Sequence, residues 1–87
     1  MSDVTLLGTE GCHLCELAQA VLVESAHYLP GLVVYLEDIG DSERDIERYG
    51  LRIPVLRHDQ SGLELDWPFD PARCVEWLRA LPVEPLA

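Results

Sequence analysis

The sequence contains no lysine, and its six arginines are set against sixteen aspartates and glutamates, which gives a formal net charge of −10. Such an acidic chain repels nucleic-acid phosphates and anionic lipid headgroups, so we expect no role in binding either. No run approaches the ~18 apolar residues that a membrane span requires. The first residues also lack the basic start and long apolar stretch of a signal peptide, since Asp3 stands where a basic residue is expected.

Cysteine is scarce as well, with three residues, an odd number too small for the disulfide framework of a small secreted domain. We therefore expect a reducing compartment and assign the protein to the cytoplasm. What the chain does contain, 48% hydrophobic and 25% charged residues, supports a packed core and excludes a disordered chain. Its 87 residues fit one small domain, with a core expected over about residues 3–81 and a tail over residues 82–87.

The first half of the chain has the pattern of a β-α-β unit. Residues 4–7 form a short apolar run that ends at Gly8, as in a buried strand. From residue 12 to about residue 28, apolar residues recur every three or four positions, which indicates an amphipathic helix. Residues 32–36 favour a second strand, which a right-handed crossover would place parallel to the first.

The second half begins with a short acidic helix, which Ser42 caps at its start and Gly50 at its end. A strand over residues 55–58 and an alternating strand over residues 63–66 follow, joined by turn-forming residues, and they predict an antiparallel hairpin.

A last helix begins after Asp70, with Pro71 at its first position, and ends before Pro82. The order β-α-β-α-β-β-α predicts a mixed α/β fold, in which helices flank a four-stranded mixed sheet.

Cys12-His13-Leu14-Cys15, between the first predicted strand and helix, is the first segment that carries chemistry. Residues three apart on a helix lie about 5–6 Å from each other, within the separation that a disulfide tolerates. Free N–H groups and the helix dipole favour an anion at a helix start. We therefore expect Cys12 to be the attacking thiolate and Cys15 the resolving thiol.

Two plainer interpretations of this pair are weaker. A disulfide that closes a four-residue loop contributes only about 2 kcal/mol, so stability alone is a poor reason for its position. A tetrahedral zinc site normally needs a second pair of ligands, and the only other cysteine is the isolated Cys74. We expect Cys74 to pack in the core, because free cysteine is among the most buried residue types.

Ile53-Pro54, at the entry to the third strand, completes a family pattern. A strand leading into a Cys-x-x-Cys helix start, a second βα unit, an Ile-Pro strand entry, a hairpin and a last helix resemble the thioredoxin fold, and its small glutaredoxin-like members most closely. The resemblance covers residues 3–81. The stretches over residues 49–55 and 65–70 are similar to those of a family of small bacterial glutaredoxin-like proteins.

The resemblance implies a thiol–disulfide oxidoreductase that acts on protein or small-molecule disulfides. It implies a cis peptide bond before Pro54, facing the dithiol, with the N–H and C=O of Ile53 unpaired for an extended substrate. It also implies a monomer without a bound organic cofactor, with glutathione as a candidate co-substrate and glutathione or thioredoxin reductase as the reducing system. Two alternatives stay open: an iron–sulfur or metal-binding protein that ligates through Cys12, and a non-catalytic binding module of the thioredoxin fold.

The charges around the dithiol depart from those of dithiol glutaredoxins. The glutaredoxins that it resembles commonly carry a basic residue before the first cysteine, whereas here Glu10 precedes and Glu16 follows, and both oppose the thiolate. A protonated His13 offsets this in one interpretation and is merely solvated in the other. Residues 66–71, where the glutaredoxin pattern holds a glutathione carboxylate, contain two prolines and two aspartates, so a good glutathione pocket is not expected. Arg52 either binds one glutathione carboxylate or pairs with the acidic second helix.

The remaining residues of interest have no assigned chemistry. Two roles are open for Trp67 and Trp77, lining a groove beside the dithiol or capping the core, and we assign neither. His27 and His58 have no metal-ligand spacing, and we expect both at the surface.

Overall fold

One mixed sheet with the strand order β2-β1-β3-β4 forms the centre of the computed structural model, which describes residues 3–82. The strands are β1 (Asp3–Gly8), β2 (Val33–Asp38), β3 (Val55–His58) and β4 (Glu64–Asp66). β1 pairs in parallel with β2 and antiparallel with β3, which pairs antiparallel with β4. The parallel crossover and the hairpin are thus confirmed. β2 and β4 both begin one residue later than expected, and β2 continues to Asp38.

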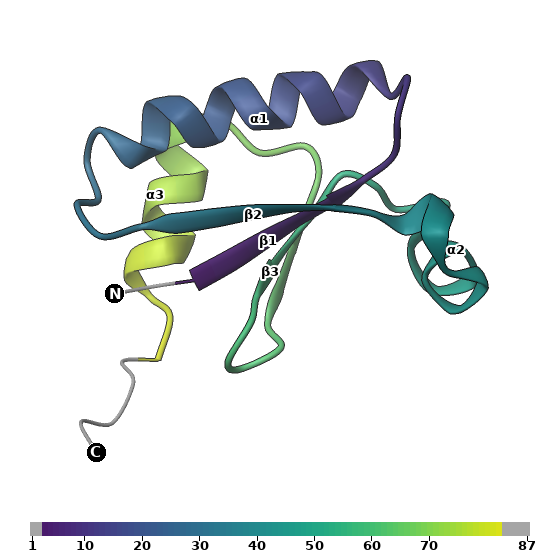
Figure 1. Ribbon diagram of the computed structural model, residues 1–87. Coiled ribbons are helices and arrows are strands. Elements are labelled where there is room, and N and C mark those ends of the chain that lie inside the picture. Colours follow the sequence, from purple (N-terminus) through teal and green to yellow (C-terminus); the bar gives the residue numbers. More distant parts are fainter. Residues whose placement is uncertain (1–2, 83–87) are drawn as a thin grey trace.

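The helices are α1 (His13–Ala26), α2 (Glu43–Tyr49) and α3 (Pro71–Arg79). Ser42 and Asp70 act as the expected N-caps, since their side chains accept the backbone N–H groups of Asp45 and Arg73. A 3₁₀ turn, η1 (Ile39–Asp41), which the sequence did not predict, follows β2. Figure 1 shows α3 near one end of the sheet and α2 beyond the other, with the start of α1 at the α2 end.

Two clusters of buried side chains cover the two faces of the sheet. Successive residues of a strand point to opposite faces, so the neighbours Leu6 and Leu7 of β1 lie in different clusters. The smaller cluster consists of Leu7, Ile39, Tyr49 and Val55. The larger one lies against α1 and α3 and consists of Val4, Leu6, Ala18, Leu22, Leu56, Leu65, Phe69, Cys74, Leu78 and Leu81. Packing on both faces fixes the end of β1, from which the chain leads into the Cys-x-x-Cys segment.

His58 lies in the interior, with 1% of its surface exposed, so its expected surface position was wrong. β3 is an internal strand between β1 and β4, and His58 points to the same face as Leu56, two residues earlier. Its Nδ1 lies 2.6 Å from the hydroxyl of Ser61 in the hairpin turn, which satisfies the buried ring. His27, at the end of α1, is exposed as predicted.

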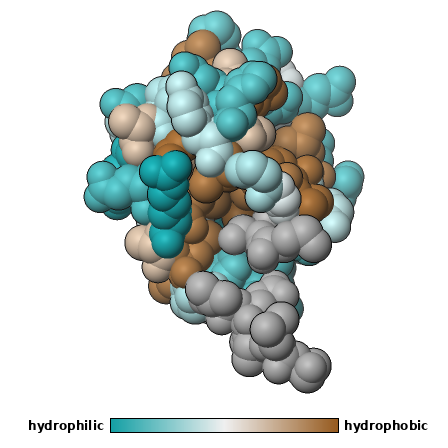
Figure 2. Space-filling view, turned by 90° about the vertical axis from the view of Figure 1, so that its left-hand side faces the viewer, coloured by the Kyte–Doolittle hydropathy of each residue, from teal (hydrophilic) through white to brown (hydrophobic). Residues whose placement is uncertain are grey.

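The surface is mixed in character. On the face seen in Figure 2, apolar side chains gather at the centre and hydrophilic ones surround them. Among the described residues, none of the helices combines the length and the apolar character that crossing a membrane requires. The expected tail lies outside the described residues except for Pro82.

Candidate active site

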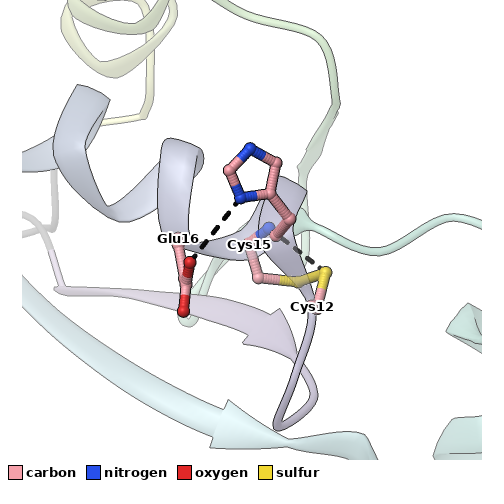
Figure 3. Close-up of a disulfide and its surroundings, with 4 residues drawn as sticks. Cys12, Cys15 and Glu16 are labelled. Carbon is pink, nitrogen blue, oxygen red and sulfur yellow. Dashed lines mark hydrogen bonds and ion pairs between the residues drawn. A yellow bond between two sulfur atoms is a disulfide. The ribbon is translucent and has the colours of Figure 1, made fainter.

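Cys12 is the N-cap of α1. Its backbone is extended (φ −86°, ψ 107°), and its Sγ accepts a hydrogen bond from the backbone N–H of Cys15 at 3.1 Å (Figure 3). An N-cap side chain normally satisfies one of the free N–H groups of the first helical turn with an oxygen. Here a sulfur takes that place, at the positive end of the helix dipole. A thiolate is a better acceptor than a thiol, so in the reduced protein an N–H in this position would favour a thiolate at Cys12 over a thiol.

The two cysteines of the motif are joined in a disulfide, with their Cα atoms 5.2 Å apart. Their accessibilities differ: Cys12 is half-buried, whereas Cys15 is 5% exposed and packs beneath the helix start. An incoming sulfur can therefore reach Cys12, and Cys15 is reached from Cys12 itself. This asymmetry supports the predicted roles of attacking and resolving thiol.

Gly8, the last residue of β1, leaves the room that Cys15 occupies. A Cβ atom at this position would lie 3.0 Å from the Cys15 sulfur and 3.3 Å from its Cβ. From its sequence context, Gly8 was expected only to end a strand. A glycine at the end of the strand that leads into the Cys-x-x-Cys segment was the signal that could have marked it as part of the site.

An open groove of about 330 Å³ begins at the dithiol segment. We call it the dithiol groove, and its lining residues are Leu14, Leu51, Arg52, Ile53, Asp66 and Trp67. Leu14 lies between the two cysteines, so the groove brings the dithiol segment together with Ile53, whose backbone was expected to bind an extended substrate. Trp67, to which the sequence assigned no role, packs edge-to-face on Phe69 with ring centroids 5.0 Å apart. Trp77 packs against the larger core cluster instead.

The Ile53–Pro54 peptide bond is cis, as is the Trp67–Pro68 bond. The N–H of Ile53 is not free, contrary to the expectation, because it donates to the carbonyl of Tyr49 at 3.0 Å as the chain leaves α2. Within residues 3–82, no backbone N–H donates to the Ile53 carbonyl. Ile53 therefore has one open backbone group, its carbonyl acceptor, rather than the expected pair.

Arg52 is held by two carboxylates of β4. Its guanidinium donates to Glu64 at 2.9 Å and to Asp66 at 2.7 Å, and the Tyr49 hydroxyl donates to the other oxygen of Glu64 at 2.7 Å. Arg52 thus forms its ion pairs with β4, so the expectation that it pairs with the acidic second helix was wrong. The hydrogen bonds that Arg52 donates to Glu64 and Asp66 raise its pKa further above the usual value. Burial alone would raise the pKa of Glu64, but the hydrogen bonds from Arg52 and Tyr49 outweigh it, and that pKa lies below its usual value.

Acidic residues line another groove beside the dithiol segment. A second groove of about 360 Å³, which we call the acidic groove, includes Glu10, Cys15, Glu37 and Asp38 in its lining. His13 is largely exposed, and its Nδ1 lies 3.7 Å from a carboxylate oxygen of Glu16, so the imidazole is paired with that carboxylate rather than with sulfur. Figure 3 shows the Glu16 side chain away from the disulfide.

Cys74 is fully buried in α3, as predicted. Burial raises the pKa of its thiol, and a hydrogen bond with Ser25 offsets only part of that rise. Within residues 3–82, no group of three or more histidine, cysteine, aspartate or glutamate side chains is arranged to hold a metal ion.

Known proteins include a family and solved structures to which this chain is similar. Residues 3–79 match the family described as glutaredoxin-like domain (DUF836). The chain is similar to the X-ray structure of the Northeast Structural Genomics target protein XcR50 from X. campestris, with 42% identity and a TM-score of 0.80 over 91% of this chain and 99% of that chain. The solution structure of the same target has 40% identity and a TM-score of 0.78 over 94% and 97% of the two chains. No curated protein matches the sequence.

Proposed function

Since the chain belongs to the glutaredoxin-like domain family (DUF836) and has the predicted thioredoxin-like fold, we propose that it is a thiol–disulfide oxidoreductase. One observation carries the proposal: a half-buried sulfur caps a helix N-terminus and is paired with a buried sulfur one turn away. A disulfide across so short a loop adds little to the stability of the fold. A disulfide that forms and breaks reversibly needs one accessible sulfur and a second sulfur close to it, as found here.

The reaction is a two-step exchange. The Cys12 thiolate attacks one sulfur of a substrate disulfide, the substrate S–S bond breaks, and the released sulfur leaves as a thiolate that takes up a proton. Cys15 then loses its proton and attacks the Cys12 sulfur. The mixed disulfide breaks, the second substrate thiol leaves, and Cys12 and Cys15 end as a disulfide. Two electrons have passed from the dithiol to the substrate.

Three features of the fold assist these steps. The Cys15 N–H stabilises the negative charge on the Cys12 sulfur before it attacks the substrate disulfide. The burial of Cys15 protects it from external disulfides, so that it reacts with Cys12. The carbonyl of Ile53 accepts an N–H of the substrate in the dithiol groove.

The oxidised dithiol must be reduced again, which takes two electrons from a thiol reductant such as glutathione or a thioredoxin system. We accordingly place the protein in a reducing compartment, the cytoplasm, as a monomer that needs no bound organic cofactor. The small number of cysteines supports this placement.

Single cysteine variants test the proposal. Cys12→Ser should abolish the reduction of a fluorescent peptide disulfide, because the attacking sulfur is gone. Cys15→Ser should accumulate the mixed disulfide between Cys12 and the peptide, which mass spectrometry detects. Cys74→Ala, in the core, is the matched control and should keep wild-type activity. Equal activity of the Cys12→Ser and Cys15→Ser variants and the wild type would refute the assignment.

A further inference from the structure

The only cationic side chain that lines the dithiol groove within the described residues is already neutralised. Arg52 donates to Glu64 and to Asp66, and the latter also lines the groove. A guanidinium that binds two carboxylates of its own chain has little uncompensated positive charge with which to attract a carboxylate of a substrate. The fold thus places the Asp66 carboxylate against Arg52, the cation that a carboxylate-bearing thiol substrate would need.

The N-terminus of α3 is also a poor binding site for an anion. The side chain of Asp70 accepts the N–H of Arg73 at 2.7 Å and adds a negative charge to this helix N-terminus. Pro68 and Pro71 in the same stretch have no N–H to donate. The acidic groove, which Cys15 lines, presents Glu10 and Asp38 together with Glu37, whose carboxylate accepts from Arg57 at 3.3 Å. A molecule with two carboxylates, such as glutathione, meets negatively charged side chains in both grooves beside the Cys-x-x-Cys segment.

The apolar lining of the dithiol groove suits a different substrate. Leu14, Ile53 and Trp67 form apolar walls, and the side chain of Leu51 is fully exposed beside them. Exposed leucines at a groove mark a surface for an apolar side chain of a partner. The carboxylate of Asp66 at the same groove is 59% exposed, so it is also accessible to a basic side chain.

We propose that the dithiol groove selects protein disulfides whose cysteine is flanked by apolar and basic residues and discriminates against glutathione, with Asp66 as the specificity-determining residue. The inference rests on the proposed function, since the chemistry remains the exchange in which Cys12 and Cys15 supply both electrons. Asp66 acts twice: it attracts a basic side chain of the substrate, and it occupies the guanidinium of Arg52 that would otherwise hold a glutathione carboxylate.

Three disulfide probes with the same fluorescent leaving thiol test the inference on the wild-type protein. Their second halves are glutathione, glutathione dimethyl ester and the blocked peptide acetyl-Leu-Cys-Arg-amide. We expect kcat/KM to be roughly tenfold higher for the peptide than for glutathione, with the ester between them, which is the scale of one or two charge contacts in water. Equal kcat/KM for the three probes would overturn the inference.

Two variants and a control then assign the discrimination to Asp66. Asp66→Asn should lower the KM for the glutathione probe about fivefold with kcat unchanged, because the Arg52 guanidinium then loses one of its two carboxylate partners and can bind a glutathione carboxylate. Adding Arg52→Gln to this variant should cancel the gain. Glu76→Gln is the matched control, since it removes one negative charge and frees Arg73 on α3, outside the dithiol groove, and it should leave the three rates unchanged.

The outcomes separate the two proposals. If the folded wild type reduces none of the probes, the proposed function fails, and the inference fails with it. If it reduces all of them, and Asp66→Asn changes KM no more than Glu76→Gln does, the oxidoreductase function stands and the specificity inference fails. Circular dichroism of each variant establishes that it is folded.

Discussion

Replacing Gly8 with alanine should change the redox chemistry without touching either cysteine. The new methyl carbon would lie 3.0 Å from the Cys15 sulfur and 3.3 Å from the Cys15 Cβ. These distances are shorter than ordinary van der Waals contacts, so the sulfur must move by a few tenths of an ångström. Cys15 is 5% exposed and packed on its other sides, so little space is free to receive it.

The cost should differ between the two redox states. In the oxidised protein the Cys15 sulfur is tied to Cys12, whereas in the reduced protein it can turn about its Cα–Cβ bond. Overpacking of a core typically costs about 1–3 kcal/mol. If the oxidised form loses roughly 1–2 kcal/mol more than the reduced form, the reduction potential rises by about 20–40 mV, because 30 mV corresponds to about 1.4 kcal/mol for two electrons.

Two measurements test this. Equilibration in glutathione buffers followed by alkylation of free thiols gives the potential, and urea unfolding with and without reductant gives the stability of each state. Gly62→Ala is the control: Gly62 has a φ of +78° and nothing near its Cβ position, so alanine should cost about 1 kcal/mol in both states. A Gly8→Ala potential equal to that of the wild type, or equal stability losses in its two states, would show that the contact with Cys15 carries no redox consequence.

Two further predictions follow from titrating groups. The pKa of Glu64 is lower in the folded protein than its ordinary value of 4.5, so its contribution to stability is present above about pH 4.5 and is lost as the pH falls through the folded value. Urea unfolding of the wild type and Glu64→Gln should therefore show a stability difference that shrinks as the medium is acidified, and a constant difference would contradict the role of its Arg52 hydrogen bond. The raised pKa of the buried Cys74 thiol keeps it protonated near neutral pH, so iodoacetamide should modify Cys12 of the reduced protein first and Cys74 only on unfolding. Mass spectrometry measures both rates, and equal rates would mean that Cys74 is accessible.

Local signals in the sequence were enough for most of the fold. Ser42 and Asp70 cap the helices that their positions predict, because an N-cap acts on N–H groups only two or three residues away. The same locality made Cys12 predictable as the sulfur at a helix start. The sequence did not predict η1, because this turn of three residues is too short to show a helical period of apolar residues. The N–H of Gly40 donates to the side chain of Asp38 in this turn.

The charge of the site depends instead on sheet register, which no local pattern encodes. Val55 pairs with Asp66 and Arg57 with Glu64, and this register brings the two carboxylates of β4 to Arg52, 12 and 14 residues earlier in the chain. A shift of one residue would turn Glu64 and Asp66 to the other face and leave the guanidinium open. The nearest acidic residues in sequence lie in α2, which is why sequence reasoning paired Arg52 with that helix. The discrimination against an anionic substrate that we infer is therefore a property of how β3 and β4 pair, and it follows from the fold rather than from the Cys-x-x-Cys motif itself.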